Sequence, residues 1–345
     1  GHVIQSVDVK SIYEVPIKYN EEKLDKKILS IFGLKEKNKA NLKIWKDIIF
    51  KINTKRKKLS IAIVGKYTGL GDSYLSVTKA LMHSAISADR KLNIIWIEAG
   101  MLEDATLAED PSSHSDAWAK LHSVDGILVP GGFGERGFEG KILTAKYARE
   151  NKVPFLGICL GMQAAVIEYA RNVLGNKSAH STEMVPECAD PAVIFMPEGS
   201  TTHMGGTMRL GARRTFFQTQ DCKAAKLYNS PPFIDERHRH RYEVNPDMVD
   251  KLEAAGCVFV GKDETNRRME ILELESHPFF LATQYHPEYK SRPGRPSPPF
   301  MGLILAASGQ LDRYITTEAI EMRINAPGGF IQSPLKALKR LNNTM

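Results

Sequence analysis

One stretch constrains the fold of this chain more than any other: Pro154-Phe155-Leu156-Gly157-Ile158-Cys159-Leu160-Gly161-Met162-Gln163. The apolar run 153–158 predicts a buried strand, and apolar residues at helical spacing follow from Met162. Cys159 therefore lies on a sharp turn between strand and helix, with a glycine two residues away on either side. Such a turn brings backbones into contact and leaves no space for Cβ atoms. This is the geometry of a nucleophile elbow, with cysteine in the position of serine.

The environment of Cys159 favours a reactive thiol. A helix that begins directly after it points free N–H groups and the positive end of its dipole at the sulfur, which favours the thiolate. We therefore predict that Cys159 is a nucleophile, although this stretch alone leaves a buried core cysteine as an alternative. The remaining cysteines show no CxxC spacing, so free thiols in a reducing compartment are expected. No paired Cys/His spacing predicts a metal site.

Strands alternate with helices after residue 58. We predict strands at 59–65, 93–97, 124–129 and 153–158, a loop at 103–117, and a short helix at 117–121. This alternation predicts parallel strands joined by right-handed crossovers, and hence an α/β fold with a doubly wound, mostly parallel sheet. The later part is richer in strands, which are predicted at 192–196, 207–217, 239–244, 257–261, 268–274 and 279–285.

The positive charge of the chain is confined to its first segment. Residues 1–58 hold 15 lysines and arginines against 7 acidic residues, so the net charge of +7 belongs to this segment and the rest is nearly neutral. Helical spacing at 21–34 and 40–53 predicts a basic, helical interdomain linker, from which something upstream has been removed. A basic face on the folded domain is not expected, which argues against nucleic-acid binding, and no apolar run predicts a membrane span.

A second segment, 279–288, supplies a base for the thiol. The run 279–285 predicts a strand that delivers His286, and Pro287 stiffens the exit. Residues two apart on an extended segment point the same way, so the Glu288 carboxylate can reach one ring nitrogen of His286 and leave the other for Cys159. The alternative is a histidine at a strand end, paired with a surface glutamate.

Backbone amides are the expected donors for an oxyanion. The Leu160 N–H directly follows the nucleophile, and the glycine loop Pro130-Gly131-Gly132-Phe133-Gly134 offers a second donor, for which Gly132 is favoured. A tight turn or a phosphate cradle is the alternative for this loop. No GxxxxGK[ST] motif occurs anywhere in the chain, so no nucleoside triphosphate site is predicted from that motif.

The motifs PGGFG, GICLGMQ and QYHPE resemble, in order and spacing, the class I (triad-type) glutamine amidotransferase family. Further segments resemble the CTP synthase family within it: Gly132–Gly137, Ser181–Glu183, Met204–Gly211, Arg237–Asn245 and Ser291–Pro293. The resemblance covers about residues 1–310 and favours a eukaryotic member. It implies a linker at 1–58, an amidotransferase domain of flavodoxin-like fold with extra antiparallel strands at 59–308, and a C-terminal helix and tail at 309–345, for which disorder is an open alternative.

The resemblance implies a Cys-His-Glu triad. Cys159 attacks the side-chain amide of glutamine, His286 passes a proton to the departing ammonia, and Glu288 orients His286. The glutamyl thioester is then hydrolysed, and the Gly132 and Leu160 amides hold the oxyanion.

The resemblance also implies further contacts. Gln163, Glu183 and Arg241 match positions that bind glutamine, as do Gly132 and Leu160; a carboxylate suits the substrate ammonium and a guanidinium suits its carboxylate. Without the family, Glu183 would be a loop acid and Arg241 a surface cation. Three residues match a loop implicated in the response to GTP: Phe133, Arg136 and Gly137.

Finally, the resemblance implies a larger enzyme. In this family the ammonia passes to a synthetase domain that uses ATP and Mg²⁺ to aminate UTP to CTP, with GTP as activator. The domain described by this sequence is expected to need no cofactor and no metal of its own. Its expected partners are L-glutamine and the N-terminal synthetase domain, within a cytoplasmic homotetramer, or a filament, when full-length. Two alternatives stay open: a catalytically idle regulatory or assembly module, and a free-standing γ-glutamyl hydrolase.

Overall fold

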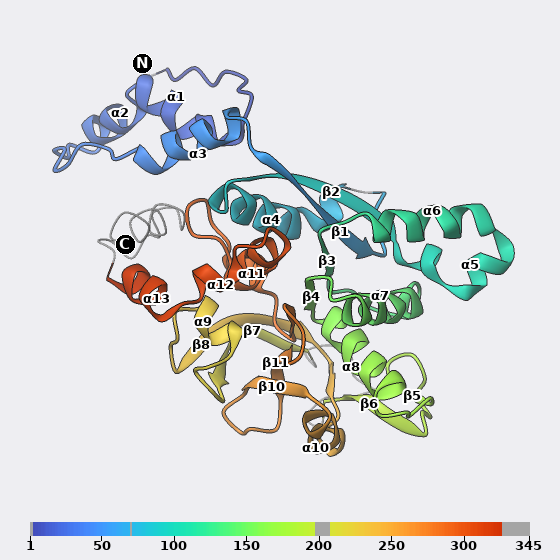
Figure 1. The fold of residues 1–345 in the computed structure, drawn as a ribbon. Coiled ribbons are helices and arrows are strands. Elements are labelled where there is room, and N and C mark those ends of the chain that lie inside the picture. The colour runs from blue at the N-terminus through green and yellow to red at the C-terminus, as the bar shows by residue number, and fades with distance from the viewer. Residues whose placement is uncertain (1–2, 70, 197–207, 326–345) are drawn as a thin grey trace.

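The computed structural model describes residues 3–69, 71–196 and 208–325, and its centre is a long mixed sheet (Figure 1). The strands of this sheet are β1 Lys57–Gly65, β2 Arg90–Glu98, β3 Gly126–Val129, β4 Phe155–Ile158, β7 Arg209–Phe217, β8 Phe233–His240, β10 Cys257–Lys262, β11 Met269–Leu274 and β12 Phe280–Thr283. They lie in the order β2-β1-β3-β4-β12-β11-β10-β7-β8. A smaller sheet consists of β5 Ala179–Ser181, β6 Asp190–Phe195 and β9 Tyr242–Val244, in the order β5-β6-β9.

The large sheet has a parallel half and an antiparallel half. Strands β2, β1, β3, β4 and β12 pair in parallel, and from β12 onward through β11, β10, β7 and β8 every pairing is antiparallel. The first four strands of the parallel half are connected through helices, as parallel pairing requires. The predicted α/β class with extra antiparallel strands is confirmed. Strand β12 is the junction between the two halves, and it carries the chain into His286.

Helices cover both faces of the parallel half (Figure 1). Helices α4 Leu75–Ser87 and α11 Pro298–Ala307 lie on one face, and α6 Pro111–His122, α7 Phe138–Glu150 and α8 Leu160–Asn172 lie on the other. Side chains of a strand alternate between the two faces of the sheet. Ile61 and Ile63 of β1 therefore pack in the core under α4 and α11, whereas Ala62 and Val64 pack in the core under α6, α7 and α8.

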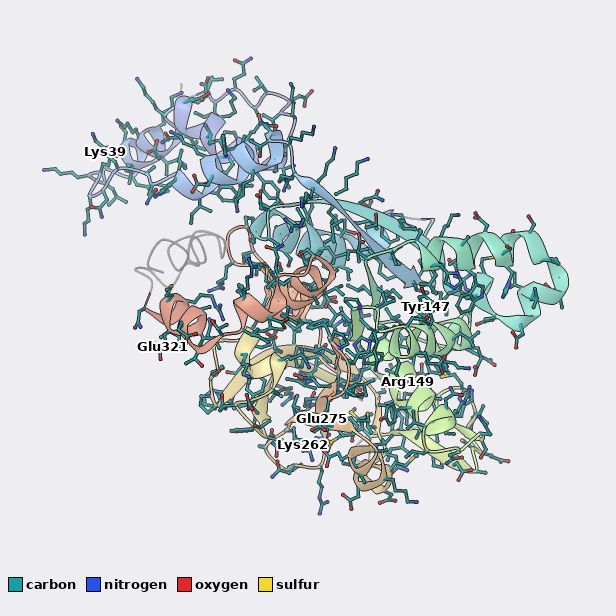
Figure 2. The ribbon with its side chains drawn as sticks, viewed as in Figure 1. Lys39, Tyr147, Arg149, Lys262, Glu275 and Glu321 are labelled. Carbon is teal, nitrogen blue, oxygen red and sulfur yellow. The ribbon has the colours of Figure 1, made fainter. Side chains whose placement is uncertain are left out.

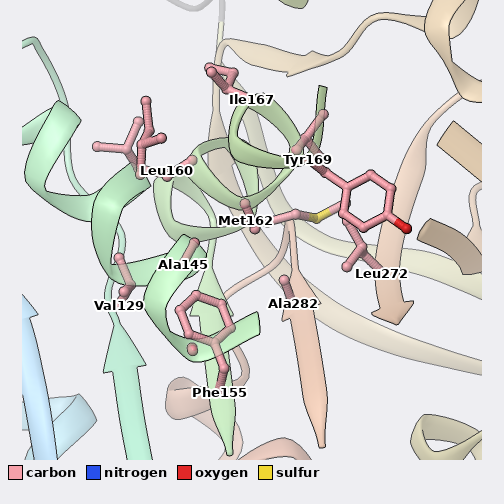
Figure 3. Close-up of a cluster of buried hydrophobic side chains, with 14 of the residues drawn as sticks. Val129, Ala145, Phe155, Leu160, Met162, Ile167, Tyr169, Leu272 and Ala282 are labelled. Carbon is pink, nitrogen blue, oxygen red and sulfur yellow. The ribbon is translucent and has the colours of Figure 1, made fainter. Parts of the chain in front are cut away.

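The core beneath α8 fixes the start of that helix. Leu160 and Met162 pack among Val129, Phe155 and Ala282, which come from the three neighbouring strands (Figure 3). Every residue from 160 to 170 is buried, because the large sheet covers one side of α8 while α7 and the small sheet cover the others. Arg149 of α7, labelled in Figure 2, pairs with the buried Glu168 of α8 at 2.7 Å.

The first segment forms short helices beside α4. Its helices are α1 Val15–Glu21, α2 Leu24–Ile31 and α3 Lys43–Asn53, with a 3₁₀ turn, η1, at Ile12–Glu14. Tyr13 and Ile48 pack against Ile86 of α4, and Tyr13 stacks on Trp45 with ring centroids 6.3 Å apart. A small apolar cluster therefore joins this segment to the α/β unit.

The predicted loop at 103–117 is wrong. This stretch forms α5 Asp104–Glu109 and most of α6. The Asp110 side chain accepts a hydrogen bond from the Ser113 amide at 3.0 Å, and Pro111 begins α6, so a cap and a proline start the helix where apolar periodicity is weak.

The remaining helices are α9 Lys223–Leu227, α10 Pro246–Ala254, α12 Leu311–Tyr314 and α13 Thr317–Ile324, with 3₁₀ turns η2 Gly71–Tyr74, η3 Ala99–Leu102 and η4 Pro287–Lys290. The quoted motif residues 204–207 and the tail from 326 lie outside the described residues. Within the described ranges, no helix is long and apolar enough to cross a membrane, and no group of three or more His, Cys, Asp and Glu is arranged to hold a metal ion.

Candidate active site

Cys159 lies at the end of β4, on the turn that opens α8. Its φ of 53° and ψ of −103° are in a region that non-glycine residues rarely occupy, and its side chain is buried. A Cβ on Gly157 would lie 2.8 Å from the Gly161 carbonyl oxygen, and a Cβ on Gly161 would lie 2.2 Å from the Val129 carbonyl oxygen. Both glycines are therefore required by close approach of backbones.

Parallel pairing brings the segment of Cys159 to that of His286. Ile158 of β4 lies opposite Thr283 of β12, and the Cys159 amide donates to the Thr283 carbonyl oxygen at 2.6 Å. A Cβ placed on Gly131 would lie 3.4 Å from the Cys159 Cβ and 2.8 Å from the His286 Cε1. Gly131 thus occupies the place where the two side chains meet, and any larger residue would enter it.

His286 is held from two sides. Its Nδ1 lies 2.8 Å from Glu288 Oε1, and its backbone amide donates to the Arg237 carbonyl oxygen at 2.8 Å. Burial lowers the pKa of His286, but the Cys159 sulfur and the Glu288 carboxylate raise it more, so its pKa lies well above the ordinary value. This direction favours an imidazolium beside the sulfur. The catalytic roles of Cys159, His286 and Glu288 remain predictions that this arrangement supports.

Gln284 contacts the sulfur and was not among the predicted site residues. Its Nε2 lies 3.6 Å from Cys159 Sγ, and its Oε1 accepts a hydrogen bond from Gln163 Nε2 at 3.3 Å. Gln163 also donates to the Tyr242 carbonyl oxygen at 2.9 Å. The only sequence signal for Gln284 was its place in the QYHPE motif, since a glutamine on a buried strand has many ordinary roles.

The start of α8 presents the predicted oxyanion donor. The Met162 and Gln163 amides both donate to the Cys159 carbonyl oxygen, so Leu160 N–H precedes the first bonds of the helix. Gly132 faces this helix, because a Cβ on it would lie 3.5 Å from Leu160 Cδ2. Leu160 and Gly132 are therefore neighbours, as the oxyanion-hole prediction requires, and that role remains a prediction.

Two predicted glutamine-binding residues lie beside the glycine loop. Glu183 Oε1 accepts a hydrogen bond from the Gly134 amide at 3.0 Å, which ties the segment after β5 to this loop. Burial raises the pKa of the Glu183 carboxyl, against the Gly134 amide and the charge of Arg241. Arg241 is a half-buried residue whose positive charge acts on the Glu183 carboxyl. Their role in binding glutamine is still a prediction.

The predicted GTP-responsive residues lie at the outer rim of the same loop. Phe133 is 41% exposed, with the Arg239 guanidinium 5.6 Å from its ring centroid. Arg136 lies 3.7 Å from Glu98 and also contacts the Lys66 carbonyl oxygen. Gly137 has a φ of 74° at the start of α7. Phe133 and Arg136 are exposed, whereas Gly137 is buried against Ala99, and the response of all three to GTP stays a prediction.

A buried network lies behind His286. Tyr285, which precedes His286, lies 3.3 Å from the Tyr228 hydroxyl, and this hydroxyl donates to Glu236 Oε1 at 3.0 Å. Glu236 is 2% exposed, and its Oε2 has no hydrogen-bond partner among the described residues. Burial raises the pKa of Glu236 to about 7. The folded protein therefore holds this carboxyl largely neutral at slightly acidic pH.

Glu236→Gln is expected to stabilise the protein at pH 8 and to have less effect at pH 5. The unfolded carboxyl ionises near pH 4.5, so between that pH and about 7 the folded state binds more protons and loses stability as pH rises. The side chain introduced by Glu236→Gln does not ionise, so it removes this loss in the free energy of unfolding, which is on the order of 1–3 kcal/mol at pH 8. Thermal melts at both pH values measure it, with the exposed Asp235→Asn as control. An equal effect at both pH values would refute the assignment.

Comparisons with known proteins agree on one family. The model of the family "Glutamine amidotransferase class-I" matches residues 70–306. CTP synthase 2 of Xenopus laevis is 51% identical over 311 residues, covering 89% of this chain and 54% of the relative. CTP synthase of Drosophila melanogaster is 51% identical over 312 residues, covering 89% and 50%. The chain spans about half the length of the curated relatives it matches.

A solved structure agrees with both the family and the fold. The glutaminase domain of Trypanosoma brucei CTPS, with bound acivicin, aligns with a TM-score of 0.67 and 38% identity, covering 73% of this chain and 95% of that chain. The family model covers well over half of the chain, and this solved domain is matched over nearly its whole length. The chain therefore belongs to the class I glutamine amidotransferase family, and within it to the glutaminase domains of CTP synthases.

Proposed function

We propose that this protein hydrolyses the side-chain amide of L-glutamine and supplies the ammonia to a synthetase domain. One observation carries the proposal. Cys159 heads α8 in a rare backbone conformation, and the His286–Glu288 pair emerges from the adjacent parallel strand. A thiol at a helix start, beside a base that a carboxylate orients, is the arrangement that covalent acyl transfer needs.

The chemistry follows from these positions. The Cys159 thiolate attacks the amide carbon, and the negative charge on the amide oxygen is held by the Leu160 and Gly132 amides. His286, as imidazolium, gives its proton to the departing nitrogen, which leaves as ammonia. Water then attacks the glutamyl thioester with His286 as base, so glutamate leaves and the thiol is restored. Glu288 keeps His286 in the orientation that both steps use.

The substrate contacts belong to the same proposal. Glutamine lies over the glycine loop, with its ammonium group at Glu183 and its carboxylate at Arg241. Glu183 accepts a hydrogen bond from this loop at Gly134, and the positive charge of Arg241 acts on the Glu183 carboxyl. Gln163 supports the site through its bond to Gln284, which in turn contacts the sulfur.

The larger enzyme completes the proposal. The ammonia aminates UTP to CTP in an ATP- and Mg²⁺-dependent synthetase domain of the full-length protein, and GTP activates the coupling. Phe133, Arg136 and Gly137 are the candidates for the response to GTP, and the exposed ring of Phe133 supports their availability. We expect the full-length enzyme to be a cytoplasmic homotetramer able to form filaments.

The coupling predicts slow glutamine hydrolysis by this chain alone. We expect glutamate release to rise at least about tenfold when the synthetase domain, its nucleotides and GTP are added, since these order the glutaminase site in a coupled enzyme. A glutamate assay with and without each component measures it. Fast hydrolysis that GTP leaves unchanged would contradict the coupling, while no hydrolysis under any condition would favour an idle module.

A glutamine-analogue electrophile tests the site independently. It is expected to label Cys159 and to spare the other cysteines, as peptide mass spectrometry can show. Burial raises the pKa of the Cys222 thiol to about 12 and raises that of Cys257 as well, so both stay protonated, and only Cys188 remains a partly exposed control. Labelling of Cys188 in preference to Cys159 would overturn the site.

A further inference from the structure

Lys141 is a buried cation to which the described part of the chain gives no hydrogen-bond partner. It lies on α7, its side chain is 0% exposed, and its Nζ has no hydrogen-bond partner among the described residues. Lysine is almost never fully buried unless it is paired, because removing an ammonium group from water is very unfavourable. A negative charge nearby would stabilise the Lys141 ammonium group, and the described residues of the resting protein provide none in direct contact with it.

The ammonium group lies directly beneath the glycine loop. A Cβ placed on Gly132 would lie 3.4 Å from Lys141 Nζ and 3.5 Å from Leu160 Cδ2. Lys141 and Leu160 therefore flank Gly132, the residue whose amide is the proposed second oxyanion donor. No other described lysine combines full burial with this position.

The acids near Lys141 are engaged elsewhere. Glu183 Oε1 accepts from the Gly134 amide at 3.0 Å, and Glu98 accepts from the Thr68 hydroxyl at 3.1 Å. Lys66 Nζ donates to the Phe133 carbonyl oxygen at 2.8 Å, and its positive charge repels the Lys141 ammonium group. The charged and titratable groups that act on Lys141 are Cys159, Lys66, Glu98 and Glu183, and Cys159 makes the largest contribution of the four.

The protonation state of Lys141 at neutral pH is compatible with a role as a positive charge. Burial lowers the pKa of Lys141 to about 8, while the sulfur of Cys159 acts in the opposite direction. At neutral pH most of the side chain is therefore still ammonium. Lys141 is therefore a fixed positive charge under the loop, which would attract an anion that forms above it during the reaction.

We propose that the Lys141 ammonium is the electrostatic partner of the anions formed at Cys159, first the thiolate and then the oxyanion over Gly132. This inference deepens the proposed function, and its oxyanion part rests on it. Lys141 acts through the loop and the nucleophile rather than by touching substrate, so it is a positioning residue. In a site from which water is excluded, such a fixed charge acts strongly on the developing anion.

The test is the pH dependence of Cys159 alkylation by iodoacetamide, followed by mass spectrometry of the Cys159 peptide. Lys141→Met keeps the length of the side chain and removes the charge. We expect the midpoint of alkylation to move up by about one pH unit, so the reaction at pH 7 slows roughly tenfold. Lys141→Gln should shift it in the same direction, and Lys141→Arg should restore part of the reactivity.

A matched control separates charge from structure. Lys146 lies on the same helix and is only partly buried, so Lys146→Met makes the same change without removing the charge beneath the loop. The melting temperature of Lys141→Met should equal or exceed that of the wild type, because an unpaired buried cation disfavours folding. A structural role would instead lower stability and leave the midpoint in place.

The outcomes distinguish this inference from the proposed function. Folded Lys141→Met and Lys141→Gln proteins with an unchanged midpoint would overturn the role of Lys141, whatever the enzyme does with glutamine. A shifted midpoint in a protein that never hydrolyses glutamine would leave Lys141 as the partner of the thiolate and overturn the glutaminase function. If both hold, kcat for glutamine in the coupled enzyme should fall roughly tenfold or more in Lys141→Met.

Discussion

Cys159→Ala is expected to abolish glutamine hydrolysis, by roughly 10⁴-fold or more in kcat. The substitution removes the sulfur that attacks the amide, and among the described residues no serine, threonine or other cysteine side chain is hydrogen-bonded to His286. Glutamine binding should persist, because Glu183 and Arg241 are untouched. Glutamate release in the presence of the synthetase domain and GTP measures the first effect, and glutamine titration by calorimetry measures the second.

The control for this substitution is Cys188→Ala. Cys188 is half-buried, and its thiol contacts only the Ser178 carbonyl oxygen at 3.6 Å among the described residues. It should retain the full rate. Fold is checked by a thermal melt, since alanine at position 159 must adopt the same rare backbone conformation as cysteine. Turnover that survives Cys159→Ala would remove the thiol from the mechanism.

Gly131→Ala is expected to lower kcat by roughly 10²-fold while the protein stays folded. The added methyl group would lie 2.8 Å from His286 Cε1, inside van der Waals contact. The imidazole must therefore move away from Cys159, or its bond with Glu288 must lengthen. The pH dependence of Cys159 alkylation should move upward as well, because the imidazolium no longer lies beside the sulfur.

Gly100→Ala provides the comparison for Gly131→Ala. A Cβ at Gly100 meets no atom within 4 Å, so it tests the same chemical change without the clash. We expect wild-type kinetics from it. Wild-type kinetics from Gly131→Ala would show that the imidazole has room to retreat without consequence, which would contradict the close packing of Cys159, Gly131 and His286.

The local parts of the fold were predictable from sequence where one signal dominated. The apolar run before Cys159 and the flanking glycines determine strand, turn and helix, because the reason for each is contained within a few residues. His286 and Glu288 do pair, but the predicted extended segment is wrong: β12 ends at Thr283, and His286 caps the 3₁₀ turn η4, whose winding brings Glu288 to the imidazole. In contrast, α5 and the first half of α6 were missed and only 117–121 was predicted as helix, because the start of α6 depends on the cap at Asp110 rather than on apolar periodicity.

The contacts that make a site from these parts are long-range. Cys159 and Gln284 are 125 residues apart and meet because β4 and β12 pair in parallel, with Ile158 opposite Thr283. In the sequence, only the complementary chemistry of a thiol and a histidine, and the order of the motifs, predict that the two segments meet. Gln284 and Gly131 were visible inside motifs, but only the structure shows that Gln284 contacts the sulfur and that the missing side chain of Gly131 leaves room for Cys159 and His286 to approach.

The burial of Lys141 could not be predicted from the sequence. On a helix with a polar face, a lysine is expected in solvent, and periodicity cannot tell which turn of the helix passes under a loop. The sequence by itself predicted the α/β class, which is confirmed, and a candidate nucleophile with a candidate base, because strand alternation and short motifs suffice for these predictions. Only the tertiary structure decided that Lys141 is buried beneath Gly132 and within reach of the charge at Cys159, since burial depends on all the elements that surround a residue.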